Sequence, residues 1–517
     1  MRKGENMKKL YAAVLSVALL MGLLSGCEER KEEVYLPTGD DQLWGDTNTP
    51  SASVTVDKLS LPYFPERGLN PYKTTDYVNQ NLFSLLYQGL FAVDADYNVY
   101  PVLCQRYSIS KDMKTYTFYP QAATFPDGEP LTAADVAASV KKAVESEMYS
   151  GRFGCVKSVE ETEDGGVAVV LNSPYENLPL LLDVPVLKKS QIDDDRPLGT
   201  GPYLYERFEE KLRLRRRTDW WCKAKLPVTA EYIELVEGKN PAQLRDEFEF
   251  NGLGLVTSDP GSSSYVDYHS DYELWDCENG IFLYLGCNSK STVLSNQTLR
   301  AALTYAIDRD TLVESYYHGF ANSAVLPASP HSPIYSKALA QKYAYAPDKL
   351  TQAVAEAEAV GAEIKLLVNS DDSIRLRVAR RIGQMLSASG LKVTMVEKNT
   401  ENYLKALKNR SFDLYLGQTR LSPNMDLSAF FNSGGSLSFG GMSTPALYGL
   451  CVNALANSGN YYTLHQKVLE DGKLIPILFR TYAIFAQRGA FSELTPARGN
   501  VFFYHVGRTL EDAKVSA

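Results

Sequence analysis

Segments with helical and strand-like periodicity alternate through the last third of this chain, and this alternation restricts the fold more than any other feature. Apolar residues recur at helical spacing in some segments and form short continuous runs in the segments between them. Such alternation is typical of an α/β protein, in which helices pack on a sheet. We expect helices at Gln297–Asp308, Lys349–Val360 and Ser373–Ser389, and strands at Ile281–Cys287, Ile364–Val368, Lys392–Val396 and Phe412–Leu416.

The first half of the chain gives fewer but clear local signals. Thr132 can cap a helix that runs to about Glu145, because Asp135 stands three residues later, where negative charge is favoured. Residues 167–171 form an apolar run that predicts a strand. Leucines at helical spacing between Tyr77 and Phe91 predict another helix.

The N-terminus has the form of a secretory signal that ends in a lipoprotein motif. A basic start precedes the apolar run Leu10–Leu24, which is shorter than the roughly 20 residues of a spanning helix. The sequence Leu24-Ser-Gly-Cys27 resembles the lipobox of bacterial lipoproteins, in which the cysteine becomes a lipid-modified N-terminus. We therefore expect a signal peptide at 1–27, a lipid anchor on Cys27 and a polar, flexible tether at 28–53. The alternative is an uncleaved membrane anchor with an incidental cysteine.

Charge and cysteine content argue against a nucleic-acid-binding protein and against a cysteine-ligated metal site. The net charge of −9 argues against a nucleic-acid binder, which would present a basic face. Six cysteines remain beyond Cys27, with no repeated C-x-x-C and no zinc-ligand spacing, so no metal site is expected. We expect mostly free, buried thiols, and a Cys277–Cys287 bridge is the alternative.

Several motifs occur together in an order that resembles one protein family. They resemble the extracellular solute-binding proteins of the dipeptide and oligopeptide ABC-importer class, family 5. Each motif is weak alone, but their joint order between about residues 70 and 310 is specific. The motifs are Leu69-Asn-Pro71, Leu86-Tyr-Gln-Gly-Leu90, Phe125-Pro-Asp-Gly-Glu-Pro-Leu-Thr-Ala-Ala-Asp-Val136, Gly199-Thr-Gly-Pro-Tyr203, Trp220-Trp221, Leu283-Tyr-Leu-Gly-Cys-Asn288 and Leu299-Arg-Ala-Ala-Leu-Thr-Tyr-Ala-Ile-Asp-Arg309.

The resemblance implies a two-lobed periplasmic-binding-protein-like α/β fold of type II, with the extra subdomain of the peptide-binding class. The chain would cross between lobes near Cys277–Ile281 and return near Tyr482–Gln487, so that two strands join them. The first lobe would comprise 54–277 and 483–517, with an inserted subdomain at about 72–174, and the second lobe 278–482. A solute would bind in the cleft between the lobes.

The family's usual anchor for a peptide α-amine is missing from its expected position. In peptide-binding relatives an Asp in a Trp-containing loop pairs with this amine. Here the Asp position falls on Ser422 or Pro423 and the Trp position falls near Arg420. Either Asp426 supplies the carboxylate from a shifted place, or Arg420 holds an anion in fork geometry. The plain alternative is that Arg420 is a solvated loop residue and Asp426 caps a helix at 427–431.

Further ligand contacts follow from positions at which family members touch their solutes. For each of these positions a role in the core or in a solvated loop is the competing interpretation. The full set of candidate ligand-binding residues is Tyr63, Phe64, Tyr149, Arg152, Asn288, Gln418, Arg420, Asn424, Asp426 and Tyr482.

No nucleophile or metalloenzyme motif is present in the sequence, and neither catalysis nor a cofactor is expected. We expect a monomeric lipoprotein on the outer face of the cell membrane that passes a peptide or peptide-like solute to the permease subunits of an ABC transporter. The alternatives are a surface lipoprotein that senses a peptide signal or chaperones a partner, and an importer component for a non-peptide anionic solute.

Overall fold

The computed structural model describes residues 58–491 and 493–515. The proposed signal peptide, Cys27 and the tether at 28–53 lie outside the described residues. The helices are α2 Tyr77–Gln80, α3 Phe83–Leu86, α4 Ala133–Glu145, α5 Pro241–Glu249, α6 Gln297–Ala302, α7 Arg309–Tyr317, α8 Lys337–Lys342, α9 Pro347–Glu356, α10 Ser373–Ala388, α11 Thr400–Lys408, α12 Ser428–Phe431, α13 Pro445–Ala456, α14 Tyr461–Asp471 and α15 Leu510–Ala513.

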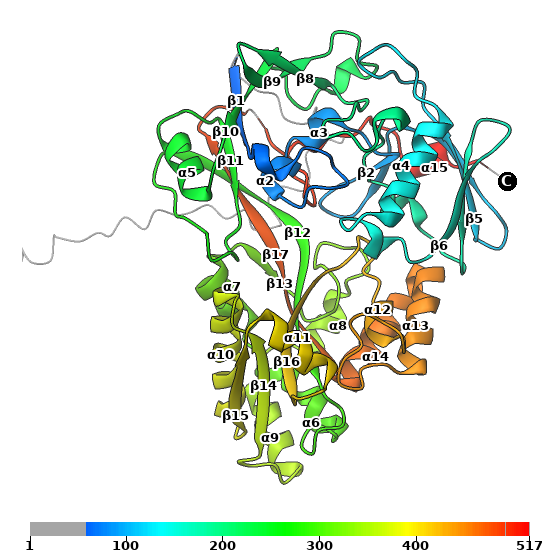
Figure 1. The fold of residues 1–517 in the computed structure, drawn as a ribbon. Helices are drawn as coiled ribbons and strands as arrows, with labels where there is room; N and C mark the ends of the chain where they lie inside the picture. Colours follow the sequence, from blue (N-terminus) through cyan, green and yellow to red (C-terminus); the bar gives the residue numbers. More distant parts are fainter. Residues whose placement is uncertain (1–57, 492, 516–517) are drawn as a thin grey trace, which may run out of the picture. The chain divides into compact units, whose positions relative to one another are not determined.

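Two long antiparallel strands, β12 (Tyr272–Cys287) and β17 (Leu474–Gln487), run through the middle of the described chain and join its two lobes (Figure 1). In the first lobe β17 also pairs with β11 (Leu255–Ser258), and in the second lobe β12 also pairs with β16 (Leu414–Arg420). Both crossing strands therefore belong to the same sheet, which continues from one lobe into the other. The expected two-lobed α/β fold with two crossing strands is confirmed.

The first lobe contains two four-stranded sheets and a small two-stranded one. One sheet has the order β1-β10-β9-β8 and another the order β4-β5-β7-β6, with α4 packed on the second. Helix α4 begins at Thr132 with a capping box that includes Asp135, as the sequence indicated. The strands are β1 Lys58–Tyr63, β2 Phe91–Val93, β3 Val99–Pro101, β4 Cys104–Ile109, β5 Thr115–Pro120, β6 Val156–Glu161, β7 Val167–Leu171, β8 Tyr203–Phe208, β9 Lys211–Arg216 and β10 Tyr232–Glu237.

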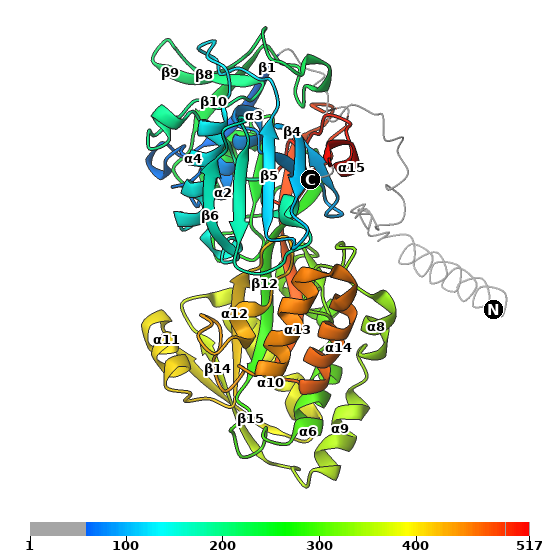
Figure 2. The same ribbon diagram turned by 90° about the vertical axis from the view of Figure 1, so that its right-hand side faces the viewer.

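The second lobe is a sheet covered by helices on both faces (Figures 1 and 2). The strands β14 (Glu363–Asn369), β15 (Lys392–Lys398) and β16 are parallel, while the short β13 (Ala321–Ser323) pairs with β17. Successive residues of β12 enter different cores: Leu283 and Leu285 pack with α6, α7, α9 and α10, whereas Phe282 and Tyr284 pack with α11 to α14. Because side chains alternate along a strand, burial on both faces requires the continuous apolar run seen here.

The C-terminal segment returns to the first lobe after β17. Phe491, Leu494, Val501 and Phe502 are buried in the same core as β1 and β10, and α15 contacts β4. Figure 2 shows α15 beside β4. Residues separated by most of the chain therefore share one hydrophobic core.

The helix expected at Tyr77–Phe91 is wrong in its extent. The segment forms two short helices, α2 and α3, and then leaves helical geometry at Tyr87. The Leu86 carbonyl accepts a hydrogen bond from Gly201 N (3.0 Å), and the Gln88 carbonyl accepts one from Val186 N (2.8 Å). Pairing with distant loops replaces the helical bonds, so tertiary contacts override the local periodicity.

The remaining expected elements of the second lobe are found with small changes. Helix α10 ends one residue before the expected Ser389, while α9 starts and ends earlier than Lys349–Val360. The segment expected as Gln297–Asp308 is α6 followed by a 3₁₀ turn at Leu303–Ala306. Helix ends are the part of a sequence-based assignment that varies most.

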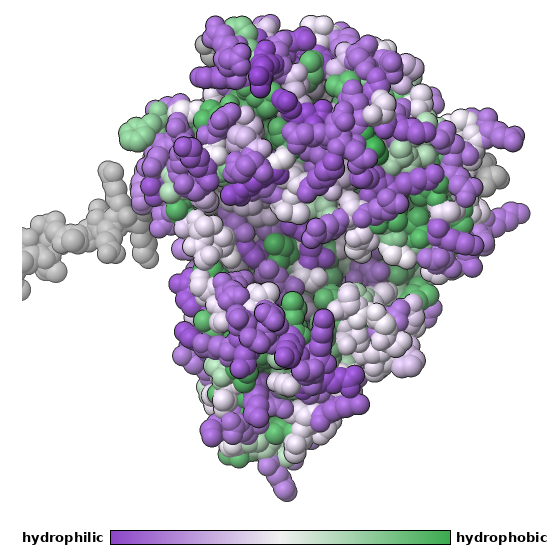
Figure 3. Space-filling view, in the orientation of Figure 1, coloured by the Kyte–Doolittle hydropathy of each residue, from purple (hydrophilic) through white to green (hydrophobic). Residues whose placement is uncertain are grey.

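All six cysteines in the described part of the chain are free. A Cys277–Cys287 bridge is excluded, because both residues lie ten positions apart on the extended strand β12, a separation of roughly 33 Å at about 3.3 Å per residue. Across residues 58–491 and 493–515, no helix combines the length and the apolar character that crossing a bilayer requires. The face in Figure 3 is mostly hydrophilic, with small scattered apolar patches.

Candidate functional site

A cavity of about 530 Å³ lies between the two lobes, in the range of about 300–1,000 Å³ that is typical of small-molecule sites. The first lobe contributes residues from 75–102, 147–152, 183–185 and 498–504, and the second lobe contributes 419–422. Asn279 of the crossing strand β12 also lines it. A ligand in this cavity would contact both lobes at once, and we call it the cleft.

One wall of the cleft is formed by a bulge in β12. Glu278 pairs with Thr481 and Phe282 with Phe479, so that residues 279–281 of β12 lie opposite Arg480 alone. Gly280 has a φ of 74°, which glycine adopts at little cost. Asn279 Oδ1 accepts a hydrogen bond from Ile281 N (3.0 Å), which leaves Asn279 Nδ2 buried without a partner among the described residues.

Arg498, from the C-terminal segment, packs against this bulge. A Cβ on Gly280 would overlap with the Arg498 guanidinium, so the glycine makes room for it. Arg498 Nη2 donates to the Leu421 carbonyl of the second lobe, and Nε is buried with no partner in the described chain. Burial lowers the pKa of Arg498. Arg498 thus connects the two lobes while part of its guanidinium stays unpaired.

Arg420 lies at the end of β16, where it pairs with Ile281 of the same bulge. Its Nη1 donates to the Asn279 carbonyl at 2.7 Å, and the rest of the side chain is exposed in the cleft. Neither Arg420 nor Arg498 has a carboxylate within ion-pair distance in the described ranges. Two cations therefore lie next to Asn279 without a counter-ion among the described residues.

Arg152 and Asp183 line the first-lobe side of the cleft and form an ion pair with each other. The Arg152 guanidinium also lies 5.1 Å from the centre of the Tyr149 ring, a cation–π contact. Burial raises the pKa of the Tyr149 phenol to about 12, so the ring enters the cleft as a neutral group. Because Arg152 neutralises Asp183, the remaining carboxylate of the lining is Glu147, which is exposed at the edge.

Gln88 supplies a fixed hydrogen-bond donor to the cleft. Its Oε1 accepts from Thr200 Oγ1 (3.0 Å) and from Trp221 Nε1 (2.9 Å). The indole N–H can only donate, so the amide orientation is determined and Nε2 is the free end. Gln88 is 4% exposed, and Nε2 has no partner within the part of the chain that the structure describes. Ser84 Oγ, also in the lining, is buried and unpartnered in the same ranges.

Of the residues predicted from the sequence, the structure brings Tyr149, Arg152 and Arg420 together in the lining of the cleft. Tyr482 lies just behind them: it is buried and its ring stacks on Tyr77. Burial raises the pKa of Tyr482, and Arg420, which hydrogen-bonds to its phenol, opposes this shift. Their contact with a ligand stays a prediction.

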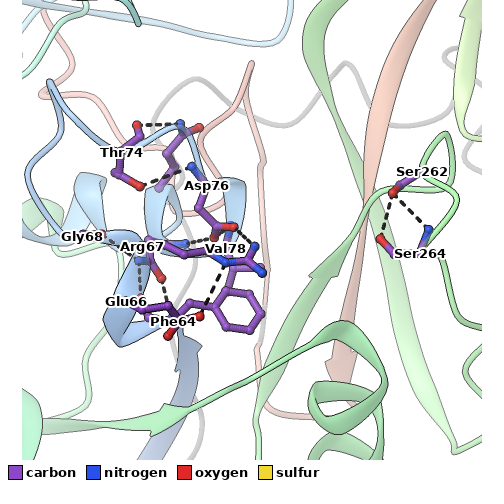
Figure 4. Close-up of polar contacts among 11 residues, drawn as sticks. Phe64, Glu66, Arg67, Gly68, Thr74, Asp76, Val78, Ser262 and Ser264 are labelled. Carbon is purple, nitrogen blue, oxygen red and sulfur yellow. Dashed lines mark hydrogen bonds and ion pairs between the residues drawn. The ribbon is translucent and has the colours of Figure 1, made fainter. Parts of the chain in front are cut away.

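Tyr63 and Phe64 lie outside the lining. The Tyr63 hydroxyl donates to Glu237 Oε1 at 2.9 Å. Phe64 is buried beneath Arg67, whose guanidinium lies 4.1 Å from the ring centre and pairs with Asp76 (Figure 4). Asp76 in turn caps α2. Tyr63 is thus tied to β10, and Phe64 packs beside the start of α2. Contact of either residue with a ligand stays untested.

Three more predicted residues have protein partners away from the cleft. Asn288 Nδ2 donates to the Phe412 carbonyl (2.9 Å), and Gln418 Oε1 accepts from Arg480 Nη1 (3.2 Å). Asp426 Oδ1 accepts from Ser428 N at 2.8 Å, one residue before the N-cap Leu427 of α12. Asp426 is not among the residues that line the cleft, so a peptide amine bound in the cleft would not reach its carboxylate in this arrangement.

Asn424 lines a second, smaller cavity of about 440 Å³ between the lobes. Its lining includes four tyrosines, Tyr97, Tyr175, Tyr461 and Tyr462. Next to it the lobes touch directly: Glu176 N donates to the Leu455 carbonyl (3.0 Å), and Ser458 N donates to Glu176 Oε2 (2.5 Å). This second cavity lies at a contact between the lobes.

Gln88, Asn279 and Arg498 also line the cleft, although they were not among the ligand-binding residues predicted from the sequence. Gln88 stands inside the motif Leu86-Tyr-Gln-Gly-Leu90, so the motif pointed to its position but not to its orientation. Asn279 and Arg498 lie in segments without any signal that distinguishes them from surface residues. No group of three or more His, Cys, Asp or Glu side chains within 58–491 and 493–515 is arranged to hold a metal ion.

Comparisons with known proteins agree with this architecture. Residues 98–439 match the model of the bacterial extracellular solute-binding proteins, family 5 (middle region). The chain is 26% identical over 342 residues to the glutathione-binding protein GsiB of Salmonella typhi, which covers 63% of this chain and 66% of that protein. The match thus spans just under two thirds of the length of the relative.

Solved structures show the same fold. The ABC transporter substrate-binding protein CtaP of Listeria monocytogenes superposes with a TM-score of 0.69 at 17% identity, over 89% of this chain and 100% of that one. The oligopeptide-binding protein AppA of Bacillus subtilis, solved with a nonapeptide, gives 0.57 at 19% identity, over 85% and 95%. At these identities the likeness concerns the fold alone.

Proposed function

We propose that this chain, which belongs to the bacterial extracellular solute-binding proteins of family 5, captures a peptide or peptide-like solute in the cleft and delivers it to the permease of an ABC importer. The observation that carries this proposal is a cavity of about 530 Å³ lined by both lobes and by β12. A solute that contacts both lobes stabilises their closed arrangement, since it gains contacts there that the open arrangement lacks.

The peptide class is supported by the relatives. GsiB is named for glutathione, and the AppA structure contains a nonapeptide. The buried polar groups of Gln88, Asn279 and Arg498 suit the carbonyl and carboxylate groups of such solutes. Binding without catalysis is the activity we propose.

We further propose a division of the lobes at the crossing strands. Residues 54–277 and 483–517 would form the first lobe, with a subdomain inserted at about 72–174, and 278–482 the second. Support comes from the shared core of the C-terminal segment and β1. Cutting the chain at residue 277 should then yield no independently folded halves, which circular dichroism of the two fragments can check.

The location we propose is the outer face of the cell membrane, with a lipid on Cys27 as the anchor and a monomer as the working form. The variant Cys27→Ala should release the protein from the membrane fraction or leave its precursor uncut. Normal processing together with membrane retention of the variant would contradict the lipid anchor.

The central test of function is the identity of the bound solute. Native mass spectrometry of the purified protein should show a small co-purifying molecule, and cells that lack the protein should lose uptake of that molecule. Uptake that continues at the normal rate without the protein would favour a sensing or chaperoning role. Small-angle scattering should show compaction when the solute is added.

A further inference from the structure

The unpaired hydrogen-bonding groups of the cleft are unevenly divided between donors and acceptors. Gln88 Nε2, Asn279 Nδ2 and Arg498 Nε are buried donors without a partner in the described residues. Asn279 and Gln88 are 1% and 4% exposed, so no bulk water compensates them in the closed site. A buried polar group without a hydrogen bond is costly, and a ligand that supplies acceptors removes that cost.

The formal charges of the cleft are biased in the same direction. Arg152 and Asp183 neutralise each other. Arg420 and Arg498 donate to backbone carbonyls, and Arg420 also lies against the neutral Tyr482 phenol, but neither has a carboxylate within ion-pair distance in the described part of the chain. Glu147, the remaining carboxylate of the lining, is exposed at the edge. An ammonium group brought into this site would face two guanidinium groups and no free buried carboxylate, whereas a carboxylate would be attracted to both.

The other groups of the lining that lack a partner in the described chain can accept a hydrogen bond: the hydroxyls of Ser84 and Tyr504, which can also donate, and the amide oxygen of Asn500, which can only accept. Asn500 Oδ1 lines the cleft and is buried without a partner in the described part of the chain. An amide N–H can satisfy it, and an amide carbonyl can satisfy Gln88 Nε2. The site therefore offers groups for amide bonds and for an anion, and its lining has no buried carboxylate free to pair with a positively charged end.

We propose that the cleft selects short peptide-like anions whose amino end is acylated or otherwise uncharged, with the carboxylate held at the β12 bulge by Arg498, Asn279 and Arg420. This inference rests on the proposed function, since it assigns the substrate class of the same site. It also explains how a chain without the family's usual Asp at the amine position can hold a peptide-like solute.

The test uses randomised tripeptide libraries in four terminal forms, offered to the purified protein in equilibrium dialysis and read by mass spectrometry. The forms combine a free or acetylated amino end with a free or amidated carboxyl end. The library with an acetylated amino end and a free carboxylate should be retained most. Preferred retention of a library with a free amine or an amidated carboxyl end would overturn the inference and leave the proposed function standing. Retention of none of the four would contradict both.

Two variants locate the carboxylate. Arg498→Gln should weaken retention roughly ten- to a hundredfold, the effect of one hydrogen bond to a charged group. Arg508→Gln is the matched control, because Arg508 lies in the same C-terminal segment and also donates to backbone carbonyls, of Cys104 and Gln105, away from the cleft. Equal retention by both variants would overturn the assignment of Arg498.

Asn279→Asp tests the same point with a change that preserves shape. The new carboxylate keeps an oxygen for the Ile281 N–H but replaces the buried donor by a negative charge. Retention of acetylated peptides should fall and retention of peptides with a free amine should rise. An unchanged preference in this folded variant would overturn the inference even if Arg498→Gln were too unstable to assay.

Discussion

Two arginines lie next to the β12 bulge with their guanidinium groups withdrawn from water, Arg480 on the paired strand β17 and Arg498 against Gly280, and their surroundings differ. Arg480 Nη2 donates to both oxygens of Asp259, at 2.6 and 2.7 Å, and Nη1 donates to Gln418. Arg498 donates to one backbone carbonyl, with no carboxylate in reach within the described ranges. The Nε atoms of both arginines have no hydrogen-bond partner among residues 58–491 and 493–515.

The pKa values of the two guanidinium groups shift in opposite directions. Burial lowers the pKa of Arg480, but Asp259 more than offsets this effect, and the net shift is upward. Burial lowers the pKa of Arg498 without such an offset. The Asp259 carboxylate thus balances the charge of Arg480, whereas the charge of Arg498, which bonds to a backbone carbonyl, stays available to an anionic ligand.

The largest expected effect comes from removing the counter-ion of Arg480. Asp259→Asn leaves a buried, unpaired guanidinium and should lower the free energy of unfolding by about 3–5 kcal/mol. Urea unfolding measures this change. The control is Asp271→Asn, which breaks the exposed pair with Arg488 and should change the free energy of unfolding far less. Equal losses of stability in Asp259→Asn and Asp271→Asn would show that burial of Arg480 does not make its counter-ion important.

The next largest effect concerns His465 in α14 of the second lobe, a third buried basic side chain to compare with the two arginines. His465 is fully buried, both ring nitrogens lack partners among the described residues, and burial lowers its pKa to about 3. Between about pH 6.5 and 3 the unfolded chain binds a proton at this residue and the folded chain does not, so stability falls as the pH falls.

At pH 5 this loss should be about 2 kcal/mol relative to neutral pH. His465→Leu should therefore lose less stability on acidification than the parent protein, which urea unfolding at the two pH values can show. His269→Gln, at an exposed position, should keep the parent's dependence on pH. A parallel pH dependence in the His465 variant would mean that His465 is protonated in the fold.

The smallest expected effect concerns the contact between Gly280 of the bulge and Arg498. Gly280→Ala places a Cβ at positive φ and against Arg498, and should lower the free energy of unfolding by at least the roughly 1–2 kcal/mol of the left-handed conformation. Gly165→Ala has a similar φ of 82° but open space around the new Cβ. The difference between the two variants, from thermal unfolding, measures the contact with Arg498.

Adding Arg498→Gln to Gly280→Ala should recover part of that difference, because the shorter side chain relieves the overlap. Strict additivity of the two substitutions would show that Arg498 does not press against the bulge.

Several parts of the fold could be predicted from the sequence because their causes are local. The capping box at Thr132 and Asp135 determines where α4 begins, and the apolar run 281–287 predicts a strand buried on both faces. The stretch Tyr77–Phe91 shows the limit of this reasoning. Its leucines have helical spacing, but the backbone of Leu86 and Gln88 pairs with residues more than ninety positions away.

The candidate site was predictable only in part for the same reason. Tyr149, Arg152 and Arg420 were found from their positions in a family pattern, and they do line the cleft. Phe64 and Asp426 came from the same pattern, yet their side chains are engaged with Arg67 and with Ser428 N. A pattern assigns a residue to a loop or strand, whereas its hydrogen-bond partners depend on the segments that pack beside it.

The sequence by itself determined the α/β class, the order of the family motifs and the apolar strands that join the lobes, since periodicity and turn chemistry act over short stretches of chain. Only the tertiary structure decided that Gln88, Asn279 and Arg498 face one cavity. Their orientation depends on a bulge in strand pairing and on the indole of Trp221. Such contacts form between residues far apart in the chain, so no local pattern encodes them.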